Sequence, residues 1–348
     1  MQILRDPVTH PSAWTGEAMR QTRQWVLGWP ADALAELETA TRHLRAEGKS
    51  MPRFALGDFP LPRTGSFLHS AIREVASGRG FVLLRGLPVD KYEPAMVRDI
   101  FWGLGCHWGT PITQNVAGDP IAEITDHGLD ATQVGVKPSM TNAEQRPHSD
   151  PCDVVALLCI RGARTGGVSR IASSMAIFNR LLEENPAGLD CLYRGFHHDL
   201  RGDETPEAPF GCTPVPIPVY RQWQGLLSCV FNATSARQAA RRMGREIPEA
   251  HLAMLDRIVE LAHSDELRLD MTFQPGDIQL LNNHTVLHWR TGYEDWPEPD
   301  RKRRLYRLWI NRPGERAVDP DFHRGYITGS RAGLPVDTGT PAYAGATR

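Results

Sequence analysis

The chain has 348 residues, enough for two average domains or for one enzymatic barrel with insertions. Lysine and arginine total 39 and aspartate and glutamate total 41, and the formal net charge of −2 argues against nucleic acid or an anionic membrane surface as a partner. Hydrophobic residues make up 41% and charged residues 23%, a balance that excludes wholesale disorder.

The cysteines and the N-terminal stretch indicate the compartment. Six cysteines are scattered without a Cys-x-x-Cys pair, so we expect free thiols in a reducing environment. The stretch MQILRDPVTHPSAWTGEAM lacks the apolar core of a secretory signal, and no apolar run approaches the ~20 residues that span a bilayer. We therefore expect a cytoplasmic protein with no membrane partner.

The first part of the chain is expected to be mostly helical. Residues 31–47 repeat leucine and alanine at helical spacing with charged residues between them, which is typical of an amphipathic helix. Ser66 is placed to cap a second helix. The elements predicted here are helices over 31–47, 66–76 and 94–104 and a buried strand over 81–86. We expect residues 1–80 to form a helical region packed on the rest.

From about Gly109 onward, short apolar runs are separated by glycine, proline, asparagine and aspartate, as in an antiparallel sandwich or small barrel. Strands are predicted over 121–125, 154–160, 167–172, 217–220, 226–231, 267–273, 277–281, 285–289 and 305–310, and helices over 175–184 and about 234–262. Pro218 limits its strand to a sheet edge. The prediction is a β-barrel with helical insertions in one domain over 81–312, followed by an irregular tail over 313–348.

The segment Arg146-Pro-His148-Ser-Asp150 offers two metal ligands. On an extended chain, one intervening residue places the His148 and Asp150 side chains on the same side. A His-x-Asp pair alone arises often by chance, and a hydrogen-bonded surface pair is then the alternative. A metal site needs a further histidine.

That histidine is offered by residues 275–290, where a Pro-Gly-Asp turn precedes an apolar strand that carries His284 and His288. The two histidines share a strand face if the segment is extended. Two neutral imidazoles and one carboxylate on one face, with the opposite face open, suit non-haem Fe(II) and its oxygen chemistry. The same donors bind zinc, so a zinc hydrolase is the alternative at this point.

An arginine-rich run follows, from Asp300 to Arg312. Four of its basic residues fit a solvated edge strand, namely Arg301, Lys302, Arg304 and Arg312. Arg303 and Arg307 lie four apart, so on a strand they point to one face together with Leu305. A guanidinium that reaches a barrel interior implies a carboxylate to receive it, and a dicarboxylate cosubstrate meets this requirement.

Taken together, these motifs resemble the taurine dioxygenase and clavaminate synthase-like group of Fe(II)/2-oxoglutarate-dependent oxygenases. The resemblance covers about residues 81–311. It rests on five pieces in the family's order: His148-Ser-Asp150, Ala163-Arg-Thr-Gly-Gly167-Val-Ser169, Pro275-Gly-Asp277, Asn283-x4-His288 and Arg303-x3-Arg307-Leu-Trp-Ile310. It implies an α+β, mainly β fold, in which a cupin-like double-stranded β-helix (jelly-roll) barrel is flanked by N-terminal helices and carries a helical insertion.

The resemblance also implies the iron ligands. His148, Asp150 and His288 match the family's three ligands to Fe(II). His288 is preferred to His284, because the family's ligand lies five residues after the asparagine that is Asn283 here. Because Asp150 keeps the carboxylate that halogenating relatives replace by a small residue, we expect no halogenation.

Cosubstrate and substrate positions follow from the same resemblance. Ser169 and Arg303 match the residues that bind the distal carboxylate of 2-oxoglutarate, with serine standing where many relatives have threonine. Arg307 matches a position that binds an acidic group of the primary substrate in several relatives, with a structural salt bridge as the alternative. Gln114 and Asn115 fall in the substrate-contacting loop, where an ordinary loop amide is the alternative.

The implied reaction is hydroxylation of an unidentified small molecule, with Fe(II), 2-oxoglutarate and O2 as cofactor and cosubstrates and with release of succinate and CO2. Two other interpretations stay open: a cupin-type hydrolase or isomerase, and a catalytically silent binding scaffold. Trp289 is expected to wall the substrate pocket, and residues 128–145 to form a loop or a lid. The apolar helices outside the barrel leave room for a homo-oligomer interface.

Overall fold

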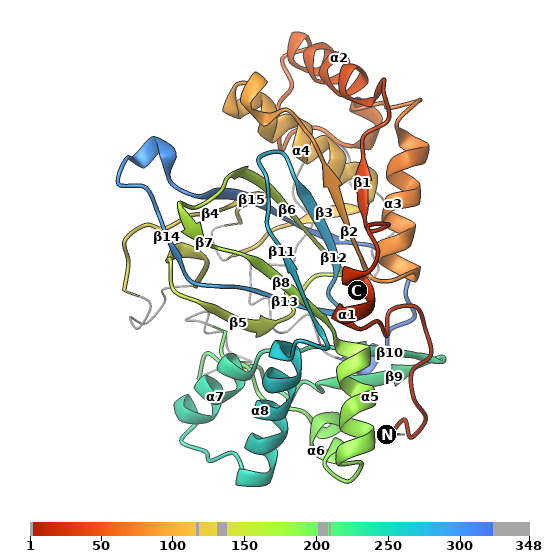
Figure 1. Cartoon of the computed structure of the whole chain (residues 1–348), viewed down its shortest axis with the longest axis vertical. Helices are drawn as coiled ribbons and strands as arrows, with labels where there is room; N and C mark the ends of the chain where they lie inside the picture. The colour runs from red at the N-terminus through yellow and green to blue at the C-terminus, as the bar shows by residue number, and fades with distance from the viewer. Residues whose placement is uncertain (1–2, 116–117, 131–137, 201–207, 209, 323–348) are drawn as a thin grey trace.

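The computed structural model describes residues 3–115, 118–130, 138–200, 208 and 210–322. Its strands form two main sheets that lie between two groups of helices (Figure 1). One group comprises α2 (Ala33–Ala46), α3 (Gly65–Ser77) and α4 (Pro94–Trp108). The other comprises α5 (Ser174–Glu184), α6 (Leu189–Arg194), α7 (Ala233–Arg242) and α8 (Glu249–His263). A short helix, α1 (Gly16–Arg20), packs on the second sheet.

The larger sheet has the strand order β1-β2-β12-β6-β15-β3, and β4 also pairs with β15. Its strands are β1 (Val26–Gly28), β2 (Phe81–Arg85), β3 (Thr110–Ile112), β4 (Ala122–Ile124), β6 (Val154–Arg161), β12 (Ile278–Asn282) and β15 (Arg304–Asn311). β1 and β2 are parallel, and the other neighbours are antiparallel. Helices cover one face of β2 and the second sheet covers the other. Because both of its faces are buried, β2 is one continuous apolar run.

The second sheet is antiparallel throughout and has the order β11-β8-β13-β5. Its strands are β5 (Gln145–His148), β8 (Ser169–Ser173), β11 (Arg268–Met271) and β13 (Val286–Arg290). Ile171, Leu269 and Val286 of this sheet share one buried cluster with Leu83 and Trp309 of the larger sheet. The two sheets therefore face each other across an apolar core, as the two layers of a jelly roll do.

The N-terminal helices pack on the outer face of the larger sheet, where Leu68 and Ile72 of α3 join Val82 and Leu280 of the strands. Ser66 does not cap α3, which corrects the sequence prediction. The helix begins at Gly65 after Thr64. The amide and hydroxyl of Thr64 both donate to the buried carboxylate of Glu36 on α2, at 2.7 and 2.6 Å, and this contact between helices fixes the start of α3.

The region predicted as one helix over 234–262 is two helices, α7 and α8. The break contains Gly244, whose φ of +61° lies in the left-handed region, and Pro248, which precedes the first turn of α8. The strand predicted over 217–220 starts at Tyr220, after Pro218. It is β9 (Tyr220–Trp223), and it pairs with β10 (Leu226–Cys229) as a separate hairpin.

Small elements complete the described chain. They are β7 (Thr165–Gly166), which pairs with β14 (Tyr293–Glu294), and the 3-10 turns η1 (Leu56–Asp58), η2 (Val89–Lys91), η3 (Pro138–Met140), η4 (Pro299–Arg301) and η5 (Pro320–Phe322). Of the tail over 313–348, the part after 322 lies outside the described residues. Phe322 is buried against Ile217 and Val230, so the start of the tail is packed on the body.

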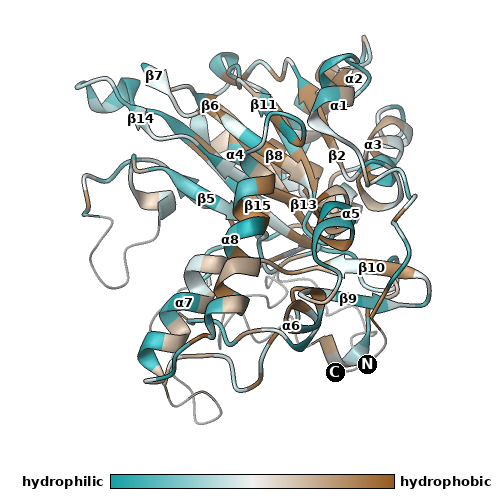
Figure 2. Cartoon of the chain, turned by 60° about the horizontal axis from the view of Figure 1, so that its bottom comes forward, coloured by the Kyte–Doolittle hydropathy of each residue, from teal (hydrophilic) through white to brown (hydrophobic). Residues whose placement is uncertain are grey.

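Hydropathy follows this layered arrangement. In Figure 2 strands of the larger sheet such as β2 and β6 are mostly hydrophobic, whereas α7 and the outer loops are largely hydrophilic. No helix in the described ranges has the length and apolar character needed to span a membrane.

Candidate metal centre and cosubstrate pocket

Adjacent strands bring His148 and His288 together. His148 ends β5, and His288 lies directly opposite it on β13. Residues directly opposite on antiparallel strands project from the same face, and the two imidazole rings lie 4.4 Å apart between centroids. Asp150 follows in the turn after β5, where its backbone N–H donates to the side-chain oxygen of Asn283 at 2.9 Å.

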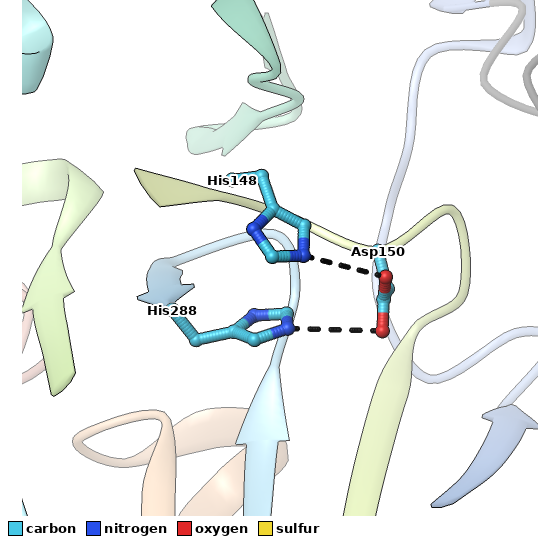
Figure 3. A group of neighbouring side chains, drawn as sticks. All are labelled: His148, Asp150 and His288. Carbon is cyan, nitrogen blue, oxygen red and sulfur yellow. Dashed lines mark ion pairs between the residues drawn. The ribbon is translucent and has the colours of Figure 1, made fainter. Parts of the chain in front are cut away.

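The three side chains converge on one point (Figure 3). The Nε2 atoms of His148 and His288 lie 3.8 and 3.7 Å from the two carboxylate oxygens of Asp150, and all the possible ligand atoms fall within 4.8 Å of one another. Nδ1 of His148 donates to the carbonyl oxygen of Arg146 at 2.9 Å, because a carbonyl can only accept. The side-chain nitrogen of Gln145, which can only donate, lies 3.2 Å from Nε2 of His148. The lone pair of His148 is therefore on Nε2, which also faces Asp150.

The charges of these groups suit a divalent cation. Burial, and then the neighbouring His148, lowers the pKa of His288 to about 3, so its imidazole is neutral at physiological pH. Burial by itself would raise the pKa of Asp150, but the charge of Arg307, together with the hydrogen bond from Trp309, holds it well below its usual range. Two neutral imidazoles and an ionised carboxylate form a donor set that fits Fe(II).

Arg307 and Trp309 hold the Asp150 carboxylate in place. Both donate to its Oδ2 atom, Arg307 through Nη1 at 3.3 Å and Trp309 through Nε1 at 2.9 Å. Arg307 also donates from Nε to the Gln114 side chain at 2.8 Å, and Gln114 donates back to the Arg307 carbonyl at 2.7 Å. Asn115 donates to Asp119 within its own loop. Of the three positions expected to contact substrate, Arg307 lines the cavity beside the metal centre.

A cavity adjoins this centre and has an empty volume of about 470 Å³, including the part that is open to solvent. Its lining residues are Ile124, Ser139, Gln145, Leu157, Ser169, Phe273, His288, Trp289, Arg290, Arg303, Leu305 and Arg307. The structure thus brings Ser169, Arg303 and Arg307 to the cavity that His288 also lines, and Trp289 forms part of its wall.

Arg303 has no anionic partner in the described part of the chain. Its side chain is 4% exposed, its Nη1 atom has no hydrogen-bond acceptor, and its guanidinium lies 5.1 Å from the centre of the Tyr293 ring. Burial lowers the pKa of Arg303. Tyr293 and the charge of Asp295 oppose this shift, but burial outweighs them. A buried cation that forms no ion pair is costly, so this end of the cavity suits a carboxylate supplied from outside.

The glycine pair of the sequence motif makes room for Arg303. Gly166 and Gly167 have φ of +74° and +67°, in the left-handed region that favours glycine. A Cβ on Gly167 would lie 3.0 Å from Nε of Arg303, and a Cβ on Gly166 would lie 2.3 Å from the carbonyl oxygen of Gly292. Ser169, two residues on, donates to the Gln279 side chain at 3.3 Å inside the barrel.

His284 lies apart from the cluster. The expectation that it shares a strand face with His288 is wrong, because β13 starts only at Val286 and His284 sits in the turn before it. Its Nε2 atom lies 2.8 Å from Oδ1 of Asp153. Arg290 and Trp309 belong to the site as well, and no sequence motif indicated a role for either. Each lies two residues from a recognised position, His288 or Arg307, and period-two alternation would have placed both on the same strand face.

Comparison with known proteins identifies the family. The model of the taurine catabolism dioxygenase TauD, TfdA family matches residues 41–309. FR-33289 synthase of Streptomyces rubellomurinus (strain ATCC 31215) is 32% identical over 320 residues, which cover 89% of this chain and 92% of that protein. The taurine hydroxylase-like protein SAT17 of Stachybotrys chartarum (strain CBS 109288 / IBT 7711) is 26% identical over 308 residues, or 85% and 77% of the two chains.

Solved structures support the fold. Asparagine oxygenase, in a complex with Fe(II), 2S,3S-3-hydroxyasparagine and succinate, has a TM-score of 0.61 at 16% identity and covers 84% of this chain and 98% of its own. The non-haem iron oxygenase OrfP, in a complex with Fe, succinate and (3S)-hydroxy-L-Arg, has a TM-score of 0.61 at 13% identity, with coverage of 82% and 94%. The predicted α+β jelly-roll fold is thereby confirmed. The chain belongs to the taurine catabolism dioxygenase TauD, TfdA family of Fe(II)- and 2-oxoglutarate-dependent oxygenases.

Proposed function

We propose that this oxygenase hydroxylates a small polar molecule at a centre formed by His148, Asp150 and His288. In the overall reaction a substrate C–H bond, 2-oxoglutarate and O2 give an alcohol, succinate and CO2. The observation that carries the proposal is that His288, one member of a buried two-histidine, one-carboxylate cluster, lines the same cavity as Arg303, a buried arginine that forms no ion pair in the described chain.

The three residues would hold Fe(II), and the neutral state of His288 and the ionised state of Asp150 support that role. When bound there, the iron supplies the redox chemistry by which O2 is used. The chain supplies the geometry: Trp309 and Arg307 fix the Asp150 carboxylate, and the Arg146 carbonyl fixes the tautomer of His148.

Ser169 and Arg303 would bind the distal carboxylate of 2-oxoglutarate. The guanidinium of Arg303 forms no ion pair and the Ser169 side chain lines the same cavity, so both can form charge-assisted hydrogen bonds to one carboxylate. This anchor would direct the 2-oxo acid end towards His288, which lines the same cavity. Apolar side chains of the wall, including Leu157, Phe273 and Leu305, would exclude water from the reacting end.

The substrate is proposed to be a small molecule with polar groups. Amino acid derivatives occupy the asparagine oxygenase and OrfP complexes, and their overall fold is that of this chain. Arg307 lines the cavity, which supports a contact with an acidic group of the substrate, although its present partners are Asp150 and Gln114. Gln114 and Asn115 stay predicted substrate contacts.

No observation favours the alternatives. A hydrolase or isomerase has no need for a second carboxylate anchor such as Arg303, and a silent scaffold has no need for three buried ligands around one point. We also keep the prediction of a cytoplasmic enzyme. It is supported by the six cysteines, which are all buried and form no disulfide.

Turnover with a panel of free amino acids and small organic acids tests the proposal. The purified enzyme is supplied with Fe(II), 2-oxoglutarate and 18O2, and succinate and product masses are measured. We expect one compound to stimulate succinate formation and to gain a single labelled oxygen atom, and the His148→Ala variant to do neither. A product that has lost two hydrogen atoms, or a stimulating compound that is released unchanged, would contradict hydroxylation.

A further inference from the structure

Arg290 faces the proposed cosubstrate site from the strand that carries His288. It lies two residues after His288 on β13, so the two side chains project from the same face. Directly opposite Arg290 on β8 is Ser169, the proposed hydroxyl contact of the distal carboxylate. Arg290 is 4% exposed and lines the same cavity as Ser169 and Arg303.

The same guanidinium ties down a neighbouring segment. Its Nη2 atom donates to the carbonyls of Pro138 at 3.0 Å and Thr141 at 2.6 Å. Its Nη1 atom donates to the carbonyls of Asn142 at 3.4 Å and Thr291 at 3.1 Å. Residues 138–142 run towards β5, which carries His148. A planar fork of fixed donors can serve several carbonyls at once, which an ammonium group on a flexible stem does less well.

Arg290 and Arg303 are two buried cations around one ring. Their guanidinium carbons lie 4.6 and 5.1 Å from the centre of the Tyr293 ring. In the described part of the chain neither forms an ion pair, and each keeps a donor without an acceptor, Nε of Arg290 and Nη1 of Arg303. Backbone carbonyls and the nearby charge of Asp295 offset only part of the cost of burying this charge, since burial still lowers the pKa of both arginines. An anion bound between the two arginines would therefore be favoured.

We propose that Arg290 is a positioning residue for the cosubstrate, which supplies the second positive charge of the distal-carboxylate site and clamps residues 138–142 beside it. The proposal rests on the proposed function, because it takes 2-oxoglutarate as the ligand of Ser169 and Arg303. It adds a physical link between that ligand and the segment that leads into β5. Binding of the carboxylate fixes the Arg290 guanidinium, and the fixed guanidinium holds the carbonyls of the segment.

The proposed role of the Arg290 charge is tested by comparing two 2-oxo acids, of which only one has a distal carboxylate. Anaerobic titrations of the Fe(II)-loaded protein with 2-oxoglutarate and with 2-oxopentanoate are followed by the visible charge-transfer band of the bound 2-oxo acid. For Arg290→Gln we expect the Kd for 2-oxoglutarate to rise about tenfold, the scale of one hydrogen bond to a charged group. The Kd for 2-oxopentanoate should stay unchanged.

The clamp is tested by hydrogen exchange in the metal-free protein, a readout that needs no turnover. Peptides covering 138–142 should exchange faster in both Arg290→Gln and Arg290→Lys.

Arg290→Lys keeps the positive charge but loses the planar set of N–H donors, so it should bind 2-oxoglutarate nearly as tightly as the wild type does. Arg304→Gln is the matched control, because Arg304 lies at the start of β15 outside the cavity lining and pairs with Glu123 at 3.7 Å. It should alter neither readout.

The outcomes separate this inference from the proposed function. If the wild type shows no band with either acid, the proposed function fails. If the wild type binds 2-oxoglutarate and Arg290→Gln binds it equally well, the inference alone is wrong. An equal loss of affinity for both acids would also overturn it, because Arg290 would then act on the 2-oxo end or on the fold. Unchanged exchange over 138–142 would refute the clamp.

Discussion

Two arginines at the barrel differ in what neutralises them. Arg85 on β2 forms a bidentate pair with Asp277, from Nε to Oδ1 at 2.9 Å and from Nη2 to Oδ2 at 2.7 Å, and Asp277 is fully buried. Arg303 is buried and its guanidinium forms no ion pair in the described chain. The hydrogen bonds to Asp277 raise the pKa of Arg85, whereas burial lowers the pKa of Arg303.

The contrast separates a structural charge from a functional one. The Arg85–Asp277 pair is complete within the fold, and Asp277 also accepts from the Gln274 amide at 2.9 Å, which closes the turn before β12. The guanidinium of Arg303 has no ion pair within the described fold, so a bound ligand can neutralise its charge. Substitutions in the Arg85–Asp277 pair should therefore reduce the stability of the fold. Substitutions of Arg303 should instead weaken the binding of 2-oxoglutarate.

The largest effect is expected at the metal cluster. His148→Ala and Asp150→Ala should reduce Fe(II) binding below detection while the protein stays folded, because each removes one of three ligands without emptying the core. Iron content after anaerobic dialysis and circular dichroism measure the two properties. His284→Ala is the control and should keep its iron, since His284 contacts Asp153 outside the cluster. Loss of iron in His284→Ala with retention in His288→Ala would contradict the ligand assignment.

A large effect on stability, but not on binding, is expected for Asp277→Ala. Removing the buried partner of Arg85 should lower the free energy of unfolding by about 3 kcal/mol, because the remaining charge and the turn lose their acceptor. Urea denaturation measures this. The folded fraction should bind 2-oxoglutarate with wild-type affinity, and a selective loss of that affinity would show that the pair belongs to the site.

Arg303→Met should show the opposite pattern. The affinity for 2-oxoglutarate should fall by about tenfold to a hundredfold, the range for a hydrogen bond to a charged group. The free energy of unfolding of the metal-free protein should rise by about 1 kcal/mol, because an unpaired buried charge is replaced by an apolar side chain. Calorimetric titration and urea denaturation give the two values. A clear loss of stability would mean that Arg303 already has a structural partner.

The smallest effect is expected at Ser169. Ser169→Ala should raise the Kd for 2-oxoglutarate about fivefold, since one hydroxyl contact is worth about 1 kcal/mol. Ser169→Thr keeps the hydroxyl and should bind as the wild type does. Equal weakening in both variants would point to packing around Gln279 instead of a contact with the ligand.

Sequence patterns predicted the main elements well where burial is strongly periodic or continuous. The apolar run of β2 and the amphipathic pattern of α2 lie within a residue or two of their predicted positions. The break between α7 and α8 was missed because a helical pattern continues across Gly244 and Pro248. Glycine and proline both tend to interrupt helices, so their presence was better evidence for a break at this point than the hydrophobic spacing was for a continuous helix.

At the site, residue spacing indicated which side chains meet but not what they bond to. His148 and Asp150 come together as an extended chain predicts. The contact of Arg307 with Asp150 joins residues 157 positions apart, and no local pattern encodes it. The position of His284 depends on where the turn before β13 ends, and strand ends are the least predictable part of such a pattern.

The most direct test of the account is an anaerobic titration of the metal-free wild-type protein with Fe(II) and then with 2-oxoglutarate. We predict that the weak visible charge-transfer band of a chelated 2-oxo acid develops and saturates in the wild type and is absent in His148→Ala. If the wild type binds Fe(II) and the band never develops, the buried cluster and the unpaired Arg303 do not form one oxygenase site, and the central claim is wrong.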